Sequence, residues 1–286
     1  MRPRPAPARE PPPELTRTVL FASPLLELAD VRCRGTCRHR SAEECTHAAQ
    51  LILPYRGAFL RHLGRRAVLA DATQVLFFGA GQPHQVSHPV DGGDASLVLT
   101  LAPQTLASLA DTGGVDARGE RFRRDRRTLS PATQLRRALL AARLARGEAG
   151  LLEAEVRLLD LAREALVEAP APRRRPTPAT LQLVERTRLR LAQADGHRLS
   201  LATIGADVGA SPVYLTQVFR DLEGVPLYRY QLQARLAQAL ARLPEADDLA
   251  ALALELGFAS HSQFATRFRA AYGLTPSLWR RQAAGR

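Results

Sequence analysis

Short apolar runs separated by turn residues fill the first third of the chain, from about residue 18 to residue 101. Runs of this length that end at glycine, proline or aspartate are typical of β-strands. In chain order they are AQLILP, GAFLRHLG, RAVLA, TQVLFFGAG, HQVSHP and, after DGGD, ASLVLTLAP. Several short strands at regular spacing predict a β-sandwich or a small barrel.

Two segments with helical periodicity follow the strands. The first, SPATQLRRALLAARLARG, begins with Ser130 as the expected N-cap and Pro131 at the first helical position. The second is LLEAEVRLLDLAREALVEA, in which residues at three- and four-residue spacings predict an amphipathic helix: Leu152, Val156, Leu159, Arg163 and Leu166. The apolar faces of these helices could cover the strands or pair with a second subunit, and the pattern favours neither.

Two proline-rich segments divide the chain. Residues 1–14 contain six prolines and too little apolar surface to fold, so we expect a disordered arm. APAPRRRPTPAT mixes proline with Arg173, Arg174 and Arg175, which predicts an extended, exposed linker. The expected organisation is an arm (1–14), a strand-rich domain with C-terminal helices (15–168), a linker (169–179) and an all-helical domain (180–286).

The helical domain contains a duplication. IGADVGASPVYLTQVFRDLEGVP (204–226) aligns with LALELGFASHSQFATRFRAAYGLTP (252–276). The matching pairs, each 49 residues apart, are Ser211 and Ser260, Leu215 and Phe264, Phe219 and Phe268, and Gly224 and Gly273. Each copy is a short apolar helix, a glycine turn, a serine cap and a second helix, which is the pattern of a helix-turn-helix unit.

The second helix of each copy has an apolar and a polar face. The apolar faces comprise Leu215, Val218, Phe219 and Leu222 in the first copy and Phe264 and Phe268 in the second. The opposite faces comprise Val213, Thr216, Gln217 and Arg220 in the first copy and Ser262, Gln263, Thr266 and Arg267 in the second. One such face is usually a solvated surface, but two copies with the same division favour contact with base edges and phosphates.

Charge supports this interpretation without locating a site. The net charge is +12, from 40 basic and 28 acidic residues. No lysine is present, so every basic side chain is a guanidinium that can form forked contacts with phosphate or guanine. Charge alone is equally compatible with a biased composition and a solvated surface.

The segment between the two copies predicts a stiff spacer. PLYRYQLQARLAQALARL (226–243) has Pro226 at the expected first helical position and places Leu232, Leu236, Ala239 and Leu243 on one face. At about 1.5 Å per residue the helix is ~27 Å long, close to the ~34 Å of one DNA turn. One rigid helix could therefore hold two recognition helices in successive major grooves.

Residues 180–282 resemble the DNA-binding domain of AraC/XylS-type transcription regulators, most closely in LALELGFASHSQFATRFRAAYGLTPSLWR. The resemblance implies that bases are read by Val213, Thr216 and Gln217 in the first unit and by Ser262, Gln263 and Thr266 in the second. It implies phosphate contacts for Arg220 and Arg267. Val213 offers no hydrogen bond, so it would contact a thymine methyl group. Gly205 stands where the family usually has alanine, and a helical glycine, which costs ~1 kcal/mol, is expected to loosen the first unit.

In that family the other domain is commonly a cupin-like β-barrel that senses a small molecule or holds a dimer together. The resemblance therefore implies a two-domain fold, with a cupin-like β-barrel and flanking helices followed by an all-α double helix-turn-helix. Enzymatic cupins have two histidines one residue apart and then an acid, whereas His84 and His88 are four apart with no carboxylate at that distance. We expect no cofactor and no metal-dependent catalysis. Candidate effector-lining residues are Arg56, Arg61, His62, His84 and His88, and ordinary turn or surface histidines are the alternative.

CRGTCRHRSAEECTH (33–47) allows a second kind of site. Cys33, Cys37 and Cys45, with His39 or His47, could offer four soft ligands to zinc. The gap between the first two cysteines is wider than in C-x-x-C, so thiols without a metal are favoured.

The sequence thus predicts a bacterial-type transcription regulator rather than an enzyme. Its expected partners are double-stranded DNA, a small-molecule effector, RNA polymerase and a second copy of the chain. No apolar run reaches the ~18 residues needed to cross a bilayer, so no membrane partner and a cytoplasmic location are expected. The alternatives are a cupin-type metalloprotein with a DNA-tethering tail and a sequence-blind architectural binder.

Overall fold

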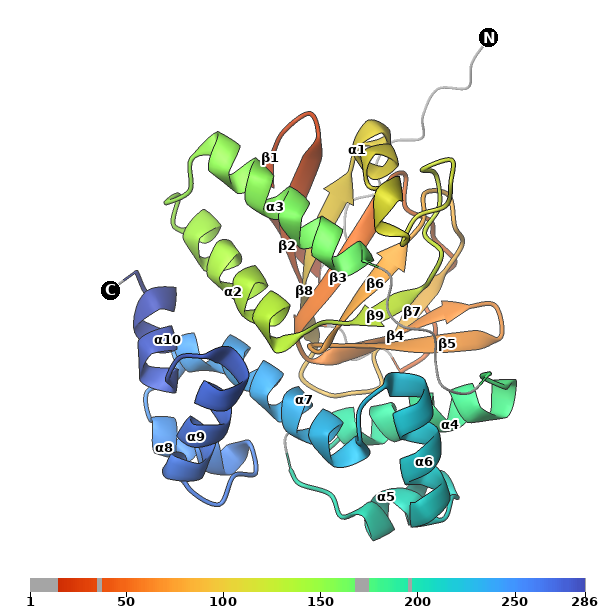
Figure 1. The fold of residues 1–286 in the computed structure, drawn as a ribbon, viewed down its shortest axis with the longest axis vertical. Helices are drawn as coiled ribbons and strands as arrows, with labels where there is room; N and C mark the ends of the chain where they lie inside the picture. Colours follow the sequence, from red (N-terminus) through yellow and green to blue (C-terminus); the bar gives the residue numbers. More distant parts are fainter. Residues whose placement is uncertain (1–14, 35–37, 168–174, 195–196, 286) are drawn as a thin grey trace.

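The computed structural model describes residues 15–34, 38–167, 175–194 and 197–285. The expected arm, Cys37 and most of the expected linker lie outside these residues. The described strands form two antiparallel sheets (Figure 1). The larger has the order β1 (Leu15–Ala22), β2 (Leu26–Cys33), β8 (Asp94–Leu101), β3 (Ala49–Arg56), β6 (Gln74–Phe78) and β9 (Arg126–Thr128). The smaller has the order β5 (Arg66–Asp71), β4 (Ala58–Leu63) and β7 (Gln85–Ser87).

Strand alternation gives the larger sheet two apolar faces. One face carries Leu97, Leu99 and Leu101 of β8 and is covered by α1 (Pro103–Ser108), α2 (Pro131–Ala145) and α3 (Leu151–Leu166). The other face packs against the smaller sheet through a separate core that includes Ile52 and Phe59. The strands expected from the sequence are confirmed, and the described strands remain two open sheets rather than one closed ladder.

Helix α3 buries a different face from the one expected. Leu152 is 74% exposed and Val156 is 48% exposed, although both belong to the predicted apolar stripe. The buried side chains are Ala154, Leu158, Leu161, Ala162, Ala165 and Leu166. The alanines, which the periodicity argument omitted, let the helix backbone approach the sheet closely. The buried face of α3 therefore covers the strands. This is one of the two alternatives that the sequence left open, the other being contact with a second subunit.

The helical part runs from α4 (Pro178–Ala192) through α5 (Leu201–Val208), α6 (Pro212–Glu223), α7 (Leu227–Arg242), α8 (Leu249–Glu255) and α9 (His261–Tyr272) to α10 (Pro276–Ala283). It has two apolar cores, one per helix-turn-helix unit. Helix α7 contributes Leu227 and Tyr230 to the first core and Leu236 and Leu240 to the second. A single helix thus connects both units, as expected (Figure 1). No helix of the described part is both long and apolar enough to span a membrane.

Candidate nucleic-acid interface

The first unit consists of α5 and α6. Gly209 ends α5 with a φ of 67°, a conformation that favours glycine. Ser211 then caps α6 by accepting a hydrogen bond from the Tyr214 N–H at 3.4 Å. Leu215 and Phe219 are fully buried and fix which face of α6 points outward. The predicted cap and the predicted core positions are confirmed.

The opposite face of α6 is open to solvent. Val213 is 80% exposed, and Gln217 and Arg220 are also exposed. The side chains of Gln217 and Arg220 make no hydrogen bond or ion pair with any residue that the structure describes. Thr216 is half-buried, and its hydroxyl donates to the Pro212 carbonyl at 2.9 Å. In the described part of the chain, the side chains of Gln217 and Arg220 are therefore available to an outside partner. The Thr216 hydroxyl instead already donates a hydrogen bond within α6.

The second unit, α8 and α9, repeats the arrangement. Ser260 caps α9 by accepting from the Gln263 N–H at 3.2 Å. Phe264 and Phe268 are fully buried, and their ring centroids lie 5.6 Å apart. The exposed residues are Ser262, Gln263, Thr266 and Arg267. Gln263 differs from its neighbours because its side-chain oxygen accepts from the Ala259 N–H at 3.0 Å, which leaves its NH₂ group and one lone pair of that oxygen available.

Gly205 lies where the turn after α5 leaves no room for a Cβ. A Cβ at this buried position would lie 2.7 Å from the Ala210 carbonyl oxygen, which belongs to the turn between α5 and α6. The Ala210 N–H also donates to the Gly205 carbonyl at 2.9 Å. Glycine therefore allows the turn to fold back closely on α5, and the effect of Gly205 on the stability of the first unit stays a prediction.

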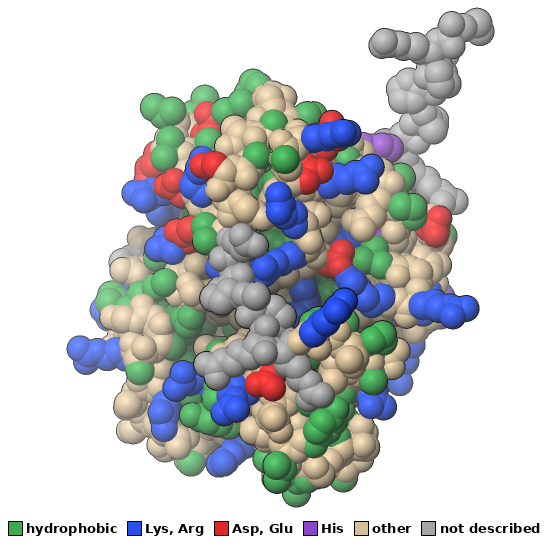
Figure 2. All heavy atoms as spheres, turned by 45° about the vertical axis from the view of Figure 1, so that its right-hand side comes forward, with side chains coloured by type: hydrophobic (Ala, Val, Ile, Leu, Met, Phe, Trp, Pro, Cys, Tyr) green, Lys and Arg blue, Asp and Glu red, His purple; other side chains and the backbone are tan. Residues whose placement is uncertain are grey.

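Helix α7 sets the spacing of the two recognition helices. Its 16 residues span about 24 Å, slightly less than the sequence predicted, because Pro226 is the N-cap and η2 (Leu243–Glu245) forms a separate 3₁₀ turn. Helices α6 and α9 lie toward opposite ends of α7 in Figure 1. Figure 2 shows arginine side chains spread from the upper to the lower half of one face, with fewer acidic side chains among them.

Sequence reasoning missed two exposed groups at the starts of the recognition helices. Tyr214, beside Val213, is 43% exposed, and His261 is the exposed first residue of α9. A phenol and an imidazole can both hydrogen-bond to phosphate or stack on a base. The signal that could have found Tyr214 is an aromatic residue one position away from the apolar stripe.

Helices α4 and α7, which contribute to the core of the first unit, are joined to the smaller sheet by a buried polar network. From α4, Glu185 accepts from the Leu69 N–H at 2.9 Å, and Arg188 donates to the Leu69 carbonyl at 3.1 Å. These two side chains satisfy the open edge of β5 as a neighbouring strand would. Arg188 also donates to Asp71 at 3.1 Å and to the Tyr230 hydroxyl at 2.9 Å. The Tyr230 hydroxyl donates in turn to Asp71 at 2.6 Å.

Two of the acids where the helices meet the sheets, Asp71 and Glu223, are held in the charged state. Burial alone would raise the pKa of Asp71, but the Arg188 guanidinium and the hydrogen bonds from Thr73 and Tyr230 outweigh it, so the pKa is lowered. Glu223, at the end of α6, is also buried, and Arg126 of β9 keeps the pKa of Glu223 below its ordinary value. The guanidinium of Arg126 approaches Glu223 to 2.6 Å.

The second unit is joined to the N-terminal part mainly by apolar contacts. Helix α2 packs Leu140 and Leu144 into the core of the larger sheet, whereas Leu135 and Leu139 pack against the core of the second unit. Polar contacts accompany them: the Tyr272 hydroxyl donates to Gln134 at 3.1 Å, and Arg146, at the end of α2, donates to the Ala283 carbonyl of α10 at 2.5 Å. The two helix-turn-helix units are thus attached to the sheets by chemically different interfaces.

The five candidate effector residues do not line one pocket. Arg56 lines a cleft of about 430 Å³ between β3 and the connection from α7 to α8. Arg61 is fully buried, donates to the Phe77 carbonyl at 2.7 Å and stacks on Phe78, and burial lowers its pKa to about 10. His62 hydrogen-bonds with Ser87 at 2.8 Å, and burial lowers its pKa.

His84 and His88 have different neighbours. His84 packs edge-on against Phe78, and burial lowers its pKa. His88 instead faces Asp94, with His88 Nε2 3.0 Å from Asp94 Oδ1. The cupin motif spacing is absent from the sequence, yet a carboxylate does lie beside this histidine in the fold. Strand pairing, rather than sequence spacing, brings Asp94 to it.

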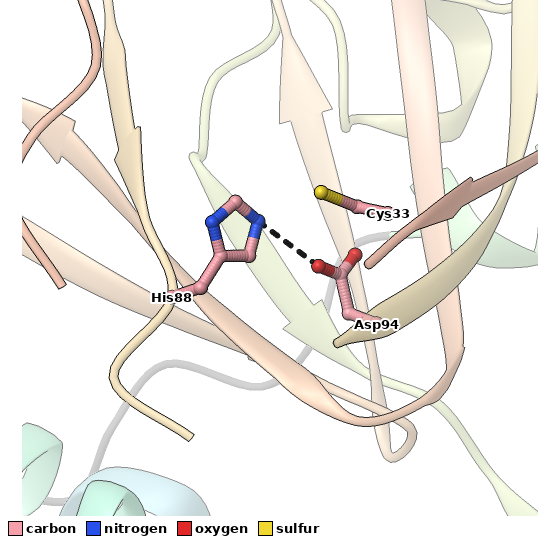
Figure 3. A group of neighbouring side chains, drawn as sticks. All are labelled: Cys33, His88 and Asp94. Atoms are coloured by element: carbon pink, nitrogen blue, oxygen red, sulfur yellow. Dashed lines mark ion pairs between the residues drawn. The ribbon is translucent and has the colours of Figure 1, made fainter. Parts of the chain in front are cut away.

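The structure describes only part of the candidate cysteine cluster, because Cys37 lies outside the described residues. Among the described residues, Cys33 groups with His88 and Asp94, and the exposed Cys45 is not part of that group (Figure 3). Cys33 ends strand β2, so the direction of its side chain is set by the sheet.

Two capped helix-turn-helix units on one chain, each with an exposed polar face, define a double helix-turn-helix DNA-binding protein. Comparison with known proteins agrees. The profile of a family described as a helix-turn-helix domain matches residues 204–282. The chain is 36% identical over 90 residues to the HTH-type transcriptional activator AarP of Providencia stuartii, covering 31% of this chain and 67% of that protein. It is 31% identical over 83 residues to the probable transcription factor PqrA of Proteus vulgaris, covering 29% and 68%.

The chain therefore belongs to the AraC/XylS-type family of helix-turn-helix transcription regulators. Among solved structures, ToxT from Vibrio cholerae O395 aligns over 96% of this chain and 99% of its own, with 12% identity and a TM-score of 0.37. An AraC-type regulator from Chromobacterium violaceum aligns over 38% and 97%, with 24% identity and a TM-score of 0.36. These structural likenesses are too weak to add to the assignment.

Proposed function

We propose that this regulator reads a specific site in double-stranded DNA with α6 and α9 and that its N-terminal sheets control the reading. The observation that carries the proposal is the repeated exposed face. In both units a serine-capped helix buries its apolar residues and leaves side chains with unoccupied hydrogen-bonding groups in solvent. Such a face suits the donors and acceptors of the major groove.

Different side chains have different tasks in this proposal. Gln217, Ser262, Gln263 and Thr266 read base edges, Thr216 contributes its hydroxyl as an acceptor, and Val213 contacts a thymine methyl group. Arg220 and Arg267 contact phosphates, which supply affinity independent of sequence. The exposure of Val213 supports its role, because an apolar residue at 80% exposure gains from contact with a methyl group.

Control from the N-terminal part acts through the two interfaces described above. The cleft that Arg56 shares with Arg32 and Tyr55 borders the connection between α7 and α8, so a small molecule bound there would contact both the sheet and the second unit. A cupin-type sensing role, a homodimer and contact with RNA polymerase are further proposals. The exposed Leu151, Leu152 and Val156 on α3 support a homodimer contact. We also propose that the chain has no catalytic activity, because the family consists of regulators.

The test is to select fragmented genomic DNA with the purified full chain and to sequence the bound fragments. The proposal predicts enrichment of a few promoter regions that share one asymmetric motif with two half-sites. Repeating the selection with candidate small molecules is expected to change the enrichment when the effector is present. Uniform recovery of all fragments would refute sequence-specific regulation and favour an architectural binder.

A further inference from the structure

The group formed by Cys33, His88 and Asp94 has the chemistry of a metal site. The sulfur, the imidazole nitrogen and the carboxylate oxygen lie within 4.8 Å of one another. Thiolate, imidazole and carboxylate are the donors that bind zinc in proteins, at about 2.0 to 2.3 Å from the metal. Donors bound to one ion at these distances lie within 4.8 Å of each other, so the spacing suits a single cation (Figure 3).

The backbone fixes these three residues in place. Cys33 and Asp94 are directly opposite in the antiparallel pair of β2 and β8, so both side chains project from the same face of the sheet. His88 follows β7 of the smaller sheet and reaches the group from the other side. A Cβ on Gly93 would lie 2.2 Å from the Cys33 carbonyl oxygen, and one on Gly57 would lie 2.0 Å from the Gly93 carbonyl oxygen. Glycine is therefore required where the turn before Asp94 packs against the end of β2 and against the turn between β3 and β4.

A buried oxygen in this group lacks a hydrogen bond. The Asp94 side chain is 9% exposed and the His88 side chain 12%. Asp94 Oδ1 lies 3.0 Å from His88 Nε2, yet it accepts no hydrogen bond of acceptable geometry from the described residues. Asp94 raises the pKa of His88, so the imidazolium balances the charge of the carboxylate when no cation is bound. A bound cation would take over that role and also satisfy the oxygen that lacks a hydrogen bond.

We propose that Cys33, His88 and Asp94 bind one zinc-type divalent cation between the two sheets. A thiolate and a carboxylate balance its two positive charges, and a neutral imidazole completes the set. Metal binding displaces the thiol proton and the imidazolium proton, which pass to solvent. Three protein ligands leave one tetrahedral position open to water or a small ligand, as in zinc sites that exchange ligands. This inference does not depend on the DNA-binding residues.

Cobalt(II) substitution tests the site in the full chain. Chelator-treated protein is titrated with cobalt(II) and then with zinc(II), and absorption is recorded. We expect a thiolate-to-cobalt charge-transfer band, visible bands of tetrahedral cobalt, saturation at one equivalent, and loss of all bands when zinc replaces cobalt. Saturation without a charge-transfer band, or no saturable binding, would overturn the proposal.

Three variants assign the ligands. Cys33→Ser and Asp94→Asn keep side-chain size and are expected to weaken zinc binding by at least about tenfold. Cys45→Ser is the matched control, because Cys45 is exposed and outside the group, and it is expected to bind zinc like the parent chain. Circular dichroism confirms that each variant is folded. Unchanged zinc affinity in the folded Cys33→Ser chain, or lost affinity in the Cys45→Ser chain, would contradict the assignment. If a variant does not fold, the cobalt spectrum of the parent chain alone tests the proposal.

Discussion

Gln217 and Gln263 are both exposed glutamines on recognition helices, but only Gln263 has a structural task. Its side-chain oxygen accepts the Ala259 N–H at the start of α9, whereas Gln217 has no such partner among the described residues. We therefore expect Gln263→Ala to lower the free energy of unfolding by about 1 kcal/mol, the net value of one hydrogen bond. Gln217→Ala is expected to leave stability within about 0.5 kcal/mol of the parent chain. Denaturant unfolding measures both changes.

Comparing Gln217→Ala with Gln263→Ala distinguishes an effect on stability from an effect on base recognition. Both substitutions are expected to reduce discrimination at one base pair of the operator by about 1 to 3 kcal/mol. If Gln217→Ala destabilised the chain as much as Gln263→Ala, the description of Gln217 as free of structural contacts would be wrong.

Gly205 gives a second prediction for a single residue. Alanine is the better helix former by about 1 kcal/mol, but its Cβ would lie 2.7 Å from the Ala210 carbonyl oxygen. Because the backbone of the turn must move, we expect Gly205→Ala to lower the free energy of unfolding by about 1 to 3 kcal/mol. Ala206→Gly, at the exposed neighbouring position, serves as the propensity control with an expected loss of about 1 kcal/mol. A more stable Gly205→Ala chain would contradict the steric account.

At this scale the sequence predicted what depends on local patterns. Serine before a short helix predicted the caps at Ser211 and Ser260, and helical spacing predicted the buried Phe264 and Phe268. Asp94 was missed because its proximity to Cys33 and His88 arises from strand register. The constraint on Gly205 was missed because it comes from a turn that folds back on the helix.

Among the elements, the contact of α4 with β5 is expected to depend on pH through Asp71. Asp71 has a lowered pKa in the folded chain, so its contribution to stability is fully present above its unfolded pKa of about 3.9. The contribution is lost as the pH falls through the lower, folded pKa. We expect Asp71→Asn to cost about 3 kcal/mol at pH 7, because Arg188 is left buried without this partner. The difference between the variant and the parent chain should shrink below about pH 4.

Asp207→Asn provides the control for this prediction. Asp207 pairs with Arg190 at the surface, where both side chains are about one third exposed, so its loss is expected to cost less than about 1 kcal/mol. Thermal unfolding at several pH values measures both variants. A difference between Asp71→Asn and the parent chain that grew as the pH fell would contradict the sign of the linkage.

The elements were predictable wherever a repeating pattern specified them. Helices α2, α3 and α7 and the strands from β3 to β8 follow periodicity and turn residues. The inward face of α3 did not, because alanine carries little hydrophobic signal although it allows close packing. The short β9 was missed because its polar sequence, Arg126–Thr128, forms a strand only by pairing with β6.

For the whole molecule, the balance between phosphate and base contacts is measurable. If about six phosphates are contacted, the logarithm of affinity should fall with the logarithm of salt concentration at a slope near −5. Arg220→Ala and Arg267→Ala are expected to weaken binding to all sequences about equally and to reduce the slope by about 1 each. A variant that changed discrimination between sequences and left the slope unaltered would contradict the phosphate assignment.

The arrangement of the two parts could not be predicted from the sequence. Composition and the duplication separated a strand-rich part from a helical part, and the family resemblance assigned a function to the latter. The docking of Arg188 and Tyr230 on Asp71 joins residues far apart in the chain, each of which is an ordinary polar residue in its own segment. The packing of α2 between two cores is likewise a property of the assembled molecule.

The central claim is that α6 and α9 both read bases. Its most direct test is the affinity of the full chain, by fluorescence anisotropy at one salt concentration, for a selected operator and for duplexes scrambled in either or both half-sites. We predict that scrambling both half-sites weakens binding at least about 10³-fold and that scrambling either one has a measurable effect. Affinities within about tenfold of one another for all four duplexes would contradict the account.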